Sequence, residues 1–82
     1  MGFIKTNLKD AYIFEPKVFG DHRGFFMETY NEKMFEEVGL SFNFIQDNHA
    51  MSAEAGTLRG LHFQLEPYAQ TKLVRVIRGA VY

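Results

Sequence analysis

Short stretches of alternating apolar and polar residues run along most of the chain, and turn residues separate them. Several such stretches at short spacing are typical of an all-β sandwich or barrel. A tight turn is expected at residues 20–24, where glycine stands at both ends. The pattern predicts strands at residues 3–6, 11–14, 24–30, 42–48, 57–64 and 72–77, with a further strand beginning at 80–82.

One segment follows the rules of a helix instead. Asn31 is a good N-cap, and Gly39 stands where helices commonly end in a left-handed residue. The apolar residues between them share one face of the expected helix and are Met34, Phe35 and Val38. We therefore expect one short helix near residues 31–38 that covers an edge or an end of the sheet.

Composition narrows the class of protein. The 82 residues allow one domain, and an apolar fraction of 46% is too high for a disordered chain. The same fraction is high for a small domain whose whole surface is in contact with water, which indicates that part of the surface binds a partner. A net charge of −1 does not indicate binding to nucleic acid or to an acidic membrane. The lack of cysteine excludes disulfides and thiolate metal sites. The sequence shows neither a signal peptide nor a long apolar run, so we expect a cytoplasmic protein.

The segment GTLRGLHFQ at residues 56–64 carries the first candidate chemistry. Its histidine, His62, could take a proton, whereas spacing alone favours an ordinary core or edge histidine. Strand alternation places Arg59 on the opposite face from His62, so a bulge at Gly60 would be needed to turn both toward one site. Lys72 is either a solvated residue at a strand end or a cation that stabilises an enolate.

Polar residues before this segment are further candidates. Gln46 and Asn48 flank Asp47 at a spacing of two, so both amides should point to one face, either into a polar pocket or outward to solvent. Arg23 lies in the glycine-rich turn and could grip a phosphate, although such an arginine is more often an ordinary surface residue. The three histidines have no metal-binding spacing, so we expect no metal site.

Four motifs in order resemble the dTDP-4-dehydrorhamnose 3,5-epimerase family: DHRGFFMETY, FIQDNHAMS, GTLRGLHFQ and KLVRVIRGAVY. The resemblance runs from about residue 3 to residue 82 and implies a cupin-type jelly roll, a β-sandwich that works without metal. It implies that residues 1–82 are the N-terminal portion of a single cupin-like epimerase domain, because family members are about twice as long. The expected fold is therefore a truncated jelly roll with one short helix, lacking some of its roughly eight strands.

The resemblance also implies a reaction and the residues that carry it. The family inverts C3 and C5 of dTDP-4-dehydro-6-deoxyglucose in dTDP-rhamnose biosynthesis, and no cofactor is expected. His62 matches the general base, and Lys72 matches the cation near the keto oxygen. The positions that match dTDP-sugar-binding residues are Arg23, Glu28, Gln46, Asp47, Asn48 and Arg59.

The shorter length leaves alternatives open. The resemblance places the acid opposite His62, and the aspartate that orients it, in the part of the family that this chain does not match. A base without that acid could exchange substrate protons without inverting the carbon. The alternative is a catalytically inactive truncated cupin that binds dTDP-sugar or only oligomerises. Unpaired sheet edges favour association, and we expect a homodimer or a higher oligomer.

Overall fold

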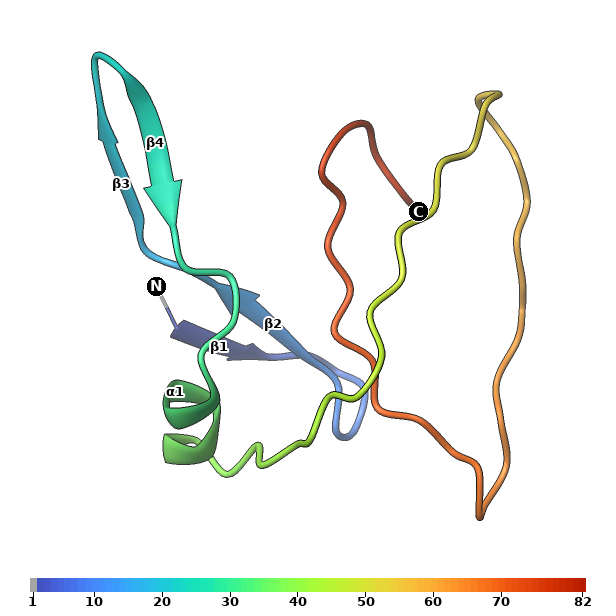
Figure 1. Ribbon diagram of the computed structural model, residues 1–82. Helices are drawn as coiled ribbons and strands as arrows, with labels where there is room; N and C mark the ends of the chain where they lie inside the picture. Colours follow the sequence, from blue (N-terminus) through green and yellow to red (C-terminus); the bar gives the residue numbers. More distant parts are fainter. Residues whose placement is uncertain (1) are drawn as a thin grey trace. The chain divides into compact units, whose positions relative to one another are not determined.

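The computed structural model describes residues 2–82 of the chain (Figure 1). The chain divides into two compact units, one ending at Asn43 and the other beginning at Phe44. All regular secondary structure of the described residues lies in the first unit. Its elements are the strands β1 (Gly2–Lys5), β2 (Tyr12–Glu15), β3 (Val18–Asp21) and β4 (Gly24–Met27) and the helix α1 (Glu32–Glu37).

Strands β1 and β2 form an antiparallel hairpin in which Phe3 pairs with Phe14. The Thr6 side chain stabilises the connecting loop: its hydroxyl donates to the Ala11 carbonyl at 2.8 Å and accepts from the Leu8 amide at 3.2 Å. The Thr6 amide also donates to the Ala11 carbonyl, at 3.3 Å. Backbone and side chain of one threonine therefore hold the two ends of the loop together and keep the strand register.

Strands β3 and β4 form a second antiparallel hairpin, joined by a two-residue turn at His22 and Arg23. Asp21 pairs with Gly24 across the turn, and the Gly24 φ of 131° is one that residues with a side chain rarely adopt. The turn expected at residues 20–24 is thus confirmed, although its outer residues belong to the strands. Each hairpin forms a two-stranded sheet of its own.

Helix α1 has both of its expected caps. The Asn31 side chain accepts a hydrogen bond from the Met34 amide at 3.1 Å. At the other end Gly39 has a φ of 83°, and its amide donates to the Glu36 carbonyl at 3.0 Å. The Leu40 amide donates to the Phe35 carbonyl at 2.9 Å, which completes a Schellman motif. The short helix near residues 31–38 is confirmed, and its limits are set by side-chain and backbone hydrogen bonds.

The core of the first unit is a cluster of four aromatic rings around Phe35, whose residue is only 3% exposed. The rings of Phe3, Phe14 and Tyr30 lie 4.8, 5.1 and 4.8 Å from the Phe35 ring, all in edge-on orientations. Such edge-to-face pairs add to the free energy of burial. Val38, which was expected on the same helix face, is half exposed. Phe35 therefore makes most of the packing contacts of this face.

The second unit contradicts the strands expected beyond the helix. No strand is assigned between residue 40 and residue 82, so the strands predicted at 42–48, 57–64, 72–77 and 80–82 are wrong for this structure. A strand exists only where a neighbouring chain pairs its backbone amides and carbonyls. Residues 2–82 supply no such neighbour for these segments, although their side-chain patterns suit a sheet. All residues from 44 to 82 are exposed.

The fold of the chain is all-β with one short helix. No helix among the described residues is long and apolar enough to cross a membrane. Large apolar side chains are exposed on the β3–β4 hairpin, including Phe25 and Phe26, each at 70%. The partner face that the composition indicates stays a prediction.

Candidate functional site

His62 and Lys72 line one open pocket of about 250 Å³ in the second unit. A turn between them explains how the chain brings both to the same place, because the Tyr68 amide donates to the Leu65 carbonyl at 2.8 Å. Pro67 is the third residue of this turn. The pocket is lined by His62, Phe63, Gln64, Ala69, Gln70 and Lys72.

The pocket combines an imidazole, an ammonium group and two side-chain amides. An imidazole can accept a proton, and a nearby ammonium stabilises negative charge on an oxygen. The volume is below the roughly 300–1,000 Å³ of typical ligand sites, so it fits part of a ligand. Since all lining residues are exposed, water screens the lysine charge, and a substrate or partner that excludes water would strengthen its effect.

Arg59 lies outside this pocket lining and is bound to the loop before it. Its Nε donates to the Ser52 hydroxyl at 3.0 Å, and its Nη2 donates to the Met51 carbonyl at 2.9 Å. Arg59 is therefore held by loop contacts and does not line the pocket of His62 and Lys72. These bonds fix the guanidinium to its loop and leave its other N–H groups as donors for a ligand.

Gly60 separates Arg59 from His62 and has a φ of 118°. A Cβ built at this position would lie 3.8 Å from the His62 amide nitrogen, which is an ordinary contact. The backbone conformation, not lack of space, therefore favours glycine here. The bulge at Gly60 that would turn Arg59 and His62 toward one site is absent from this structure, because residues 57–64 pair with no strand that a bulge could interrupt.

The amides of Gln46 and Asn48 contact each other, with Gln46 Nε2 donating to Asn48 Oδ1 at 3.2 Å. This bond confirms that the two side chains point to the same side of the chain. Both residues are exposed, as is Asp47 between them. Together they form an accessible polar patch that can donate and accept hydrogen bonds.

Two further candidates lie in the first unit. The Arg23 guanidinium binds the Asp21 carboxylate, with Nη2 2.6 Å from Oδ2, and the Arg23 amide donates to Asp21 Oδ1 at 2.8 Å. These hydrogen bonds lower the pKa of the Asp21 carboxyl below its usual 3.8 and raise the pKa of Arg23. They occupy one side of the guanidinium, and its remaining N–H groups can donate to an anion.

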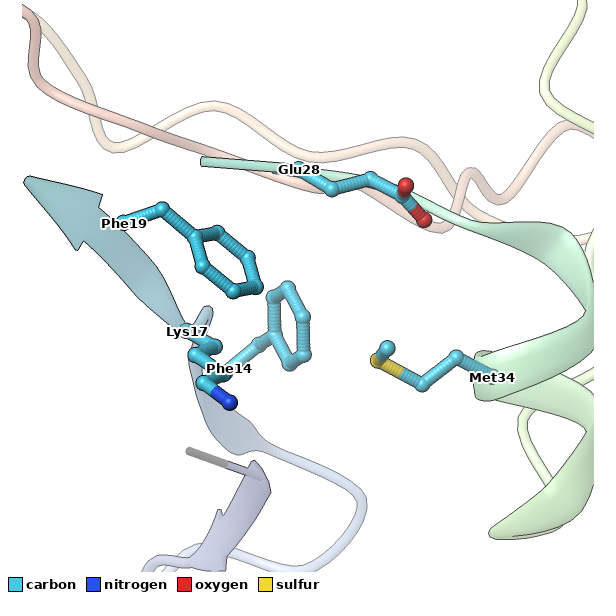
Figure 2. Close-up of a pocket in the computed structure, with 5 residues that line it drawn as sticks. All are labelled: Phe14, Lys17, Phe19, Glu28 and Met34. Carbon is cyan, nitrogen blue, oxygen red and sulfur yellow. The ribbon is translucent and has the colours of Figure 1, made fainter. Parts of the chain in front are cut away.

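Glu28 lines a second pocket, of about 180 Å³, with mainly apolar walls (Figure 2). Figure 2 shows the Glu28 and Met34 side chains reaching toward a space beside the Phe14 and Phe19 rings. Lys17 completes the lining, and its Nζ lies 5.0 Å from the centre of the Phe19 ring.

Sequence reasoning found Glu28 through the family resemblance but missed the other four lining residues of this pocket. The spacing of two between Lys17 and Phe19 was a usable signal, because such residues share a strand face. Among residues 2–82 no group of three or more His, Asp or Glu side chains could hold a metal ion.

A family model described as dTDP-4-dehydrorhamnose 3,5-epimerase matches residues 5–82, nearly the whole chain. The chain belongs to this family. A dTDP-4-dehydrorhamnose 3,5-epimerase of Shigella flexneri is 63% identical over 83 residues, an alignment that covers 100% of this chain and 45% of the relative. One of Methanothermobacter thermautotrophicus is 59% identical and covers 98% of this chain and 42% of the relative. The chain thus spans less than half the length of these epimerases.

Solved structures of the epimerase family agree in fold. The crystal structure of the Bacillus anthracis dTDP-4-dehydrorhamnose 3,5-epimerase with TDP and PPi bound is 57% identical and superposes with a TM-score of 0.77. That match covers 82% of this chain and 38% of the other. The Elizabethkingia anophelis epimerase is 61% identical, with a TM-score of 0.53 over 58% of this chain. The expected all-β fold of the cupin-type epimerases is confirmed by the first of these likenesses.

Proposed function

We propose that this chain provides the base and the charge-stabilising cation of a dTDP-4-dehydrorhamnose 3,5-epimerase. The substrate would be dTDP-4-dehydro-6-deoxyglucose, inverted at C3 and C5. The observation that carries the proposal is that His62 and Lys72 line one pocket within a chain matched to this family over residues 5–82. The cytoplasmic location expected from the sequence remains part of the proposal.

The chemistry follows from the ketone at C4. Both C3 and C5 lie beside this carbonyl, so loss of a proton from either carbon leaves an enolate with its negative charge on the C4 oxygen. In the proposal a neutral His62 imidazole takes the proton, and the Lys72 ammonium stabilises the oxygen. Return of a proton to the opposite face of the carbon inverts the centre.

Six other residues are proposed to bind the nucleotide sugar. Arg23 and Arg59 each keep guanidinium N–H groups beyond those bound within the chain, and these suit phosphate oxygens. Glu28, together with the exposed polar patch of Gln46, Asp47 and Asn48, offers acceptors and amide donors suited to hydroxyl and ring N–H groups.

A second candidate function is binding without inversion. It is favoured by the exposure of all residues from 44 to 82, which leaves His62 and Lys72 in water. In this case the chain binds dTDP-sugar or takes part only in association as a homodimer or higher oligomer. The exposed phenylalanines of the β3–β4 hairpin support association.

Incubation with dTDP-4-dehydro-6-deoxyglucose in heavy water separates these functions. The epimerase proposal expects deuterium at C3 and C5, detected by NMR, together with inverted product. His62→Asn should slow deuterium uptake by about 10²–10⁴-fold, because the general base is removed. His22→Asn is the matched control, since His22 lies in the exposed β3–β4 turn, and it should leave uptake unchanged.

The possible results lead to different conclusions. Undiminished uptake in His62→Asn would show that His62 is not the base. Deuterium uptake without inversion would support proton abstraction by this chain and locate the opposing acid elsewhere. Binding of the dTDP-sugar with no uptake would favour the second candidate function.

A further inference from the structure

The Asn31 side chain makes two hydrogen bonds in opposite directions. Its Oδ1 accepts from the Met34 amide at 3.1 Å, which caps helix α1. Its Nδ2 donates to Glu28 Oε1 in a short hydrogen bond. One planar amide therefore connects the chain after β4 to the first turn of the helix.

Both partners of Asn31 line the same pocket, whose walls include Glu28 and Met34 (Figure 2). The helix that carries Met34 is fixed in turn by Phe35, the buried centre of the aromatic cluster. A residue at this place determines how the Glu28 carboxylate is held relative to the apolar wall. The bond to Oε1 takes up one carboxylate oxygen, so Oε2 is the oxygen better able to accept from a ligand.

We propose that Asn31 is a positioning residue for Glu28, holding its carboxylate in the orientation that accepts a hydrogen bond from the nucleotide part of the ligand. This inference rests on the proposed function, which places Glu28 in dTDP-sugar binding. Without the Asn31 donor, a long exposed glutamate would lose conformational freedom on each binding event, and affinity would fall.

Substitutions at residue 31 can separate capping from positioning. Serine and aspartate are N-caps about as good as asparagine, so Asn31→Ser and Asn31→Asp should keep the melting temperature close to that of the unchanged chain. Serine lacks the amide donor, and aspartate places a second carboxylate beside Glu28. We expect Asn31→Ser to weaken dTDP binding by about 3- to 10-fold and Asn31→Asp at least as much, as measured by isothermal titration calorimetry with dTDP.

A double-mutant cycle with Glu28→Ala assigns the effect to the proposed contact, because alanine has no oxygen that could accept from Asn31. If Asn31 acts through the Glu28 carboxylate, Asn31→Ser should cause much less loss of affinity in the Glu28→Ala background. Equal losses in both backgrounds, accompanied by a lower melting temperature, would show that Asn31 acts only through the helix and would overturn the inference.

Two other outcomes distinguish this inference from the proposed function. Unchanged dTDP affinity in Asn31→Ser, with weakened affinity in Glu28→Ala, would overturn the positioning role and leave the function of Glu28 standing. If Glu28→Ala binds dTDP like the unchanged chain, or if the unchanged chain does not bind dTDP, both the Glu28 assignment and the inference fail.

Discussion

The two units of this chain differ in how they use their apolar residues. The first unit gathers Phe3, Phe14, Tyr30 and Phe35 into a cluster, pairs four strands and caps a helix at both ends. The second unit contains the pocket with His62 and Lys72, yet each of its residues is exposed. The residues with the most reactive chemistry thus lie where the described chain packs least.

This difference shows that local order and chemical function have separate requirements. Caps and two-residue turns need only nearby residues, so the helix ends and the β3–β4 turn of the first unit find their hydrogen-bond partners within it. A pocket that stabilises an enolate must also exclude water, and this requires neighbours on several sides. The second unit has residue types suited to the proposed reaction but few covering groups among residues 44–82.

The largest expected effect tests whether the aromatic cluster is the main source of stability. Phe35→Ala should lower the free energy of unfolding by about 3–5 kcal/mol, because it removes a buried ring and leaves a cavity. Phe63→Ala, the same change at a residue that is 79% exposed in the second unit, should cost less than about 1 kcal/mol. Urea unfolding followed by circular dichroism measures both. A comparable loss for Phe63→Ala would mean that the second unit has a packed core and that the two units do not differ in packing.

A smaller effect is expected at two glycines with similar φ angles. Gly39 at the end of α1 and Gly56 in the second unit have φ values of 83° and 78°. Gly39→Ala should cost about 1–2 kcal/mol, since alanine in a left-handed conformation would strain the Schellman motif. Gly56→Ala should cost less, because the exposed chain around it can change its angles without breaking a helix. Equal losses in thermal unfolding would show that residue 56 is held as firmly as residue 39.

The smallest expected effect concerns pH and the Asp21–Arg23 pair in the first unit. The pKa of Asp21 is lowered, so the pair stabilises the β3–β4 turn above the usual carboxyl pKa of 3.8, and this contribution is lost as pH falls through the lower folded value. The Arg23 and Asp21 side chains are 78% and 44% exposed, so the effect on stability should be slight. Arg23→Gln should move the Asp21 pKa back toward 3.8 in an NMR titration. An unchanged pKa would show that the pair does not persist in solution.

Sequence reasoning predicted the elements whose cause is local. Asn31 and Gly39 each act within one turn of the helix, so residue type and position were sufficient to place α1. The β3–β4 turn was found for the same reason, because Gly24 and the Asp21 side chain fix it over four residues. The exact ends of the three strands predicted in this unit depended on pairing and shifted by up to three residues, and β3 was not predicted as a strand.

Features that need distant partners were predicted less well. Alternation correctly placed the Gln46 and Asn48 amides on one side, but it could not supply the neighbouring strand that residues 42–48 would need. The pocket beside Glu28 combines residues from β2, β3 and α1 and from the connections between them, and no short motif contains them all. The family resemblance supplied the assignments of Glu28 and Lys72, which spacing alone did not favour.

The ring cluster around Phe35 also has a consequence for the order of folding. Each hairpin can close over a short loop, whereas the contact between Phe3 and Phe35 must close a loop of about thirty residues before any burial compensates for the lost entropy. Phe35 comes after both hairpins in the chain, so the Phe3 and Phe14 rings of the β1–β2 hairpin lack this cover until it arrives. The first unit should therefore acquire its stability in one late, cooperative step, with the rate of folding limited by the meeting of the two ends of this segment.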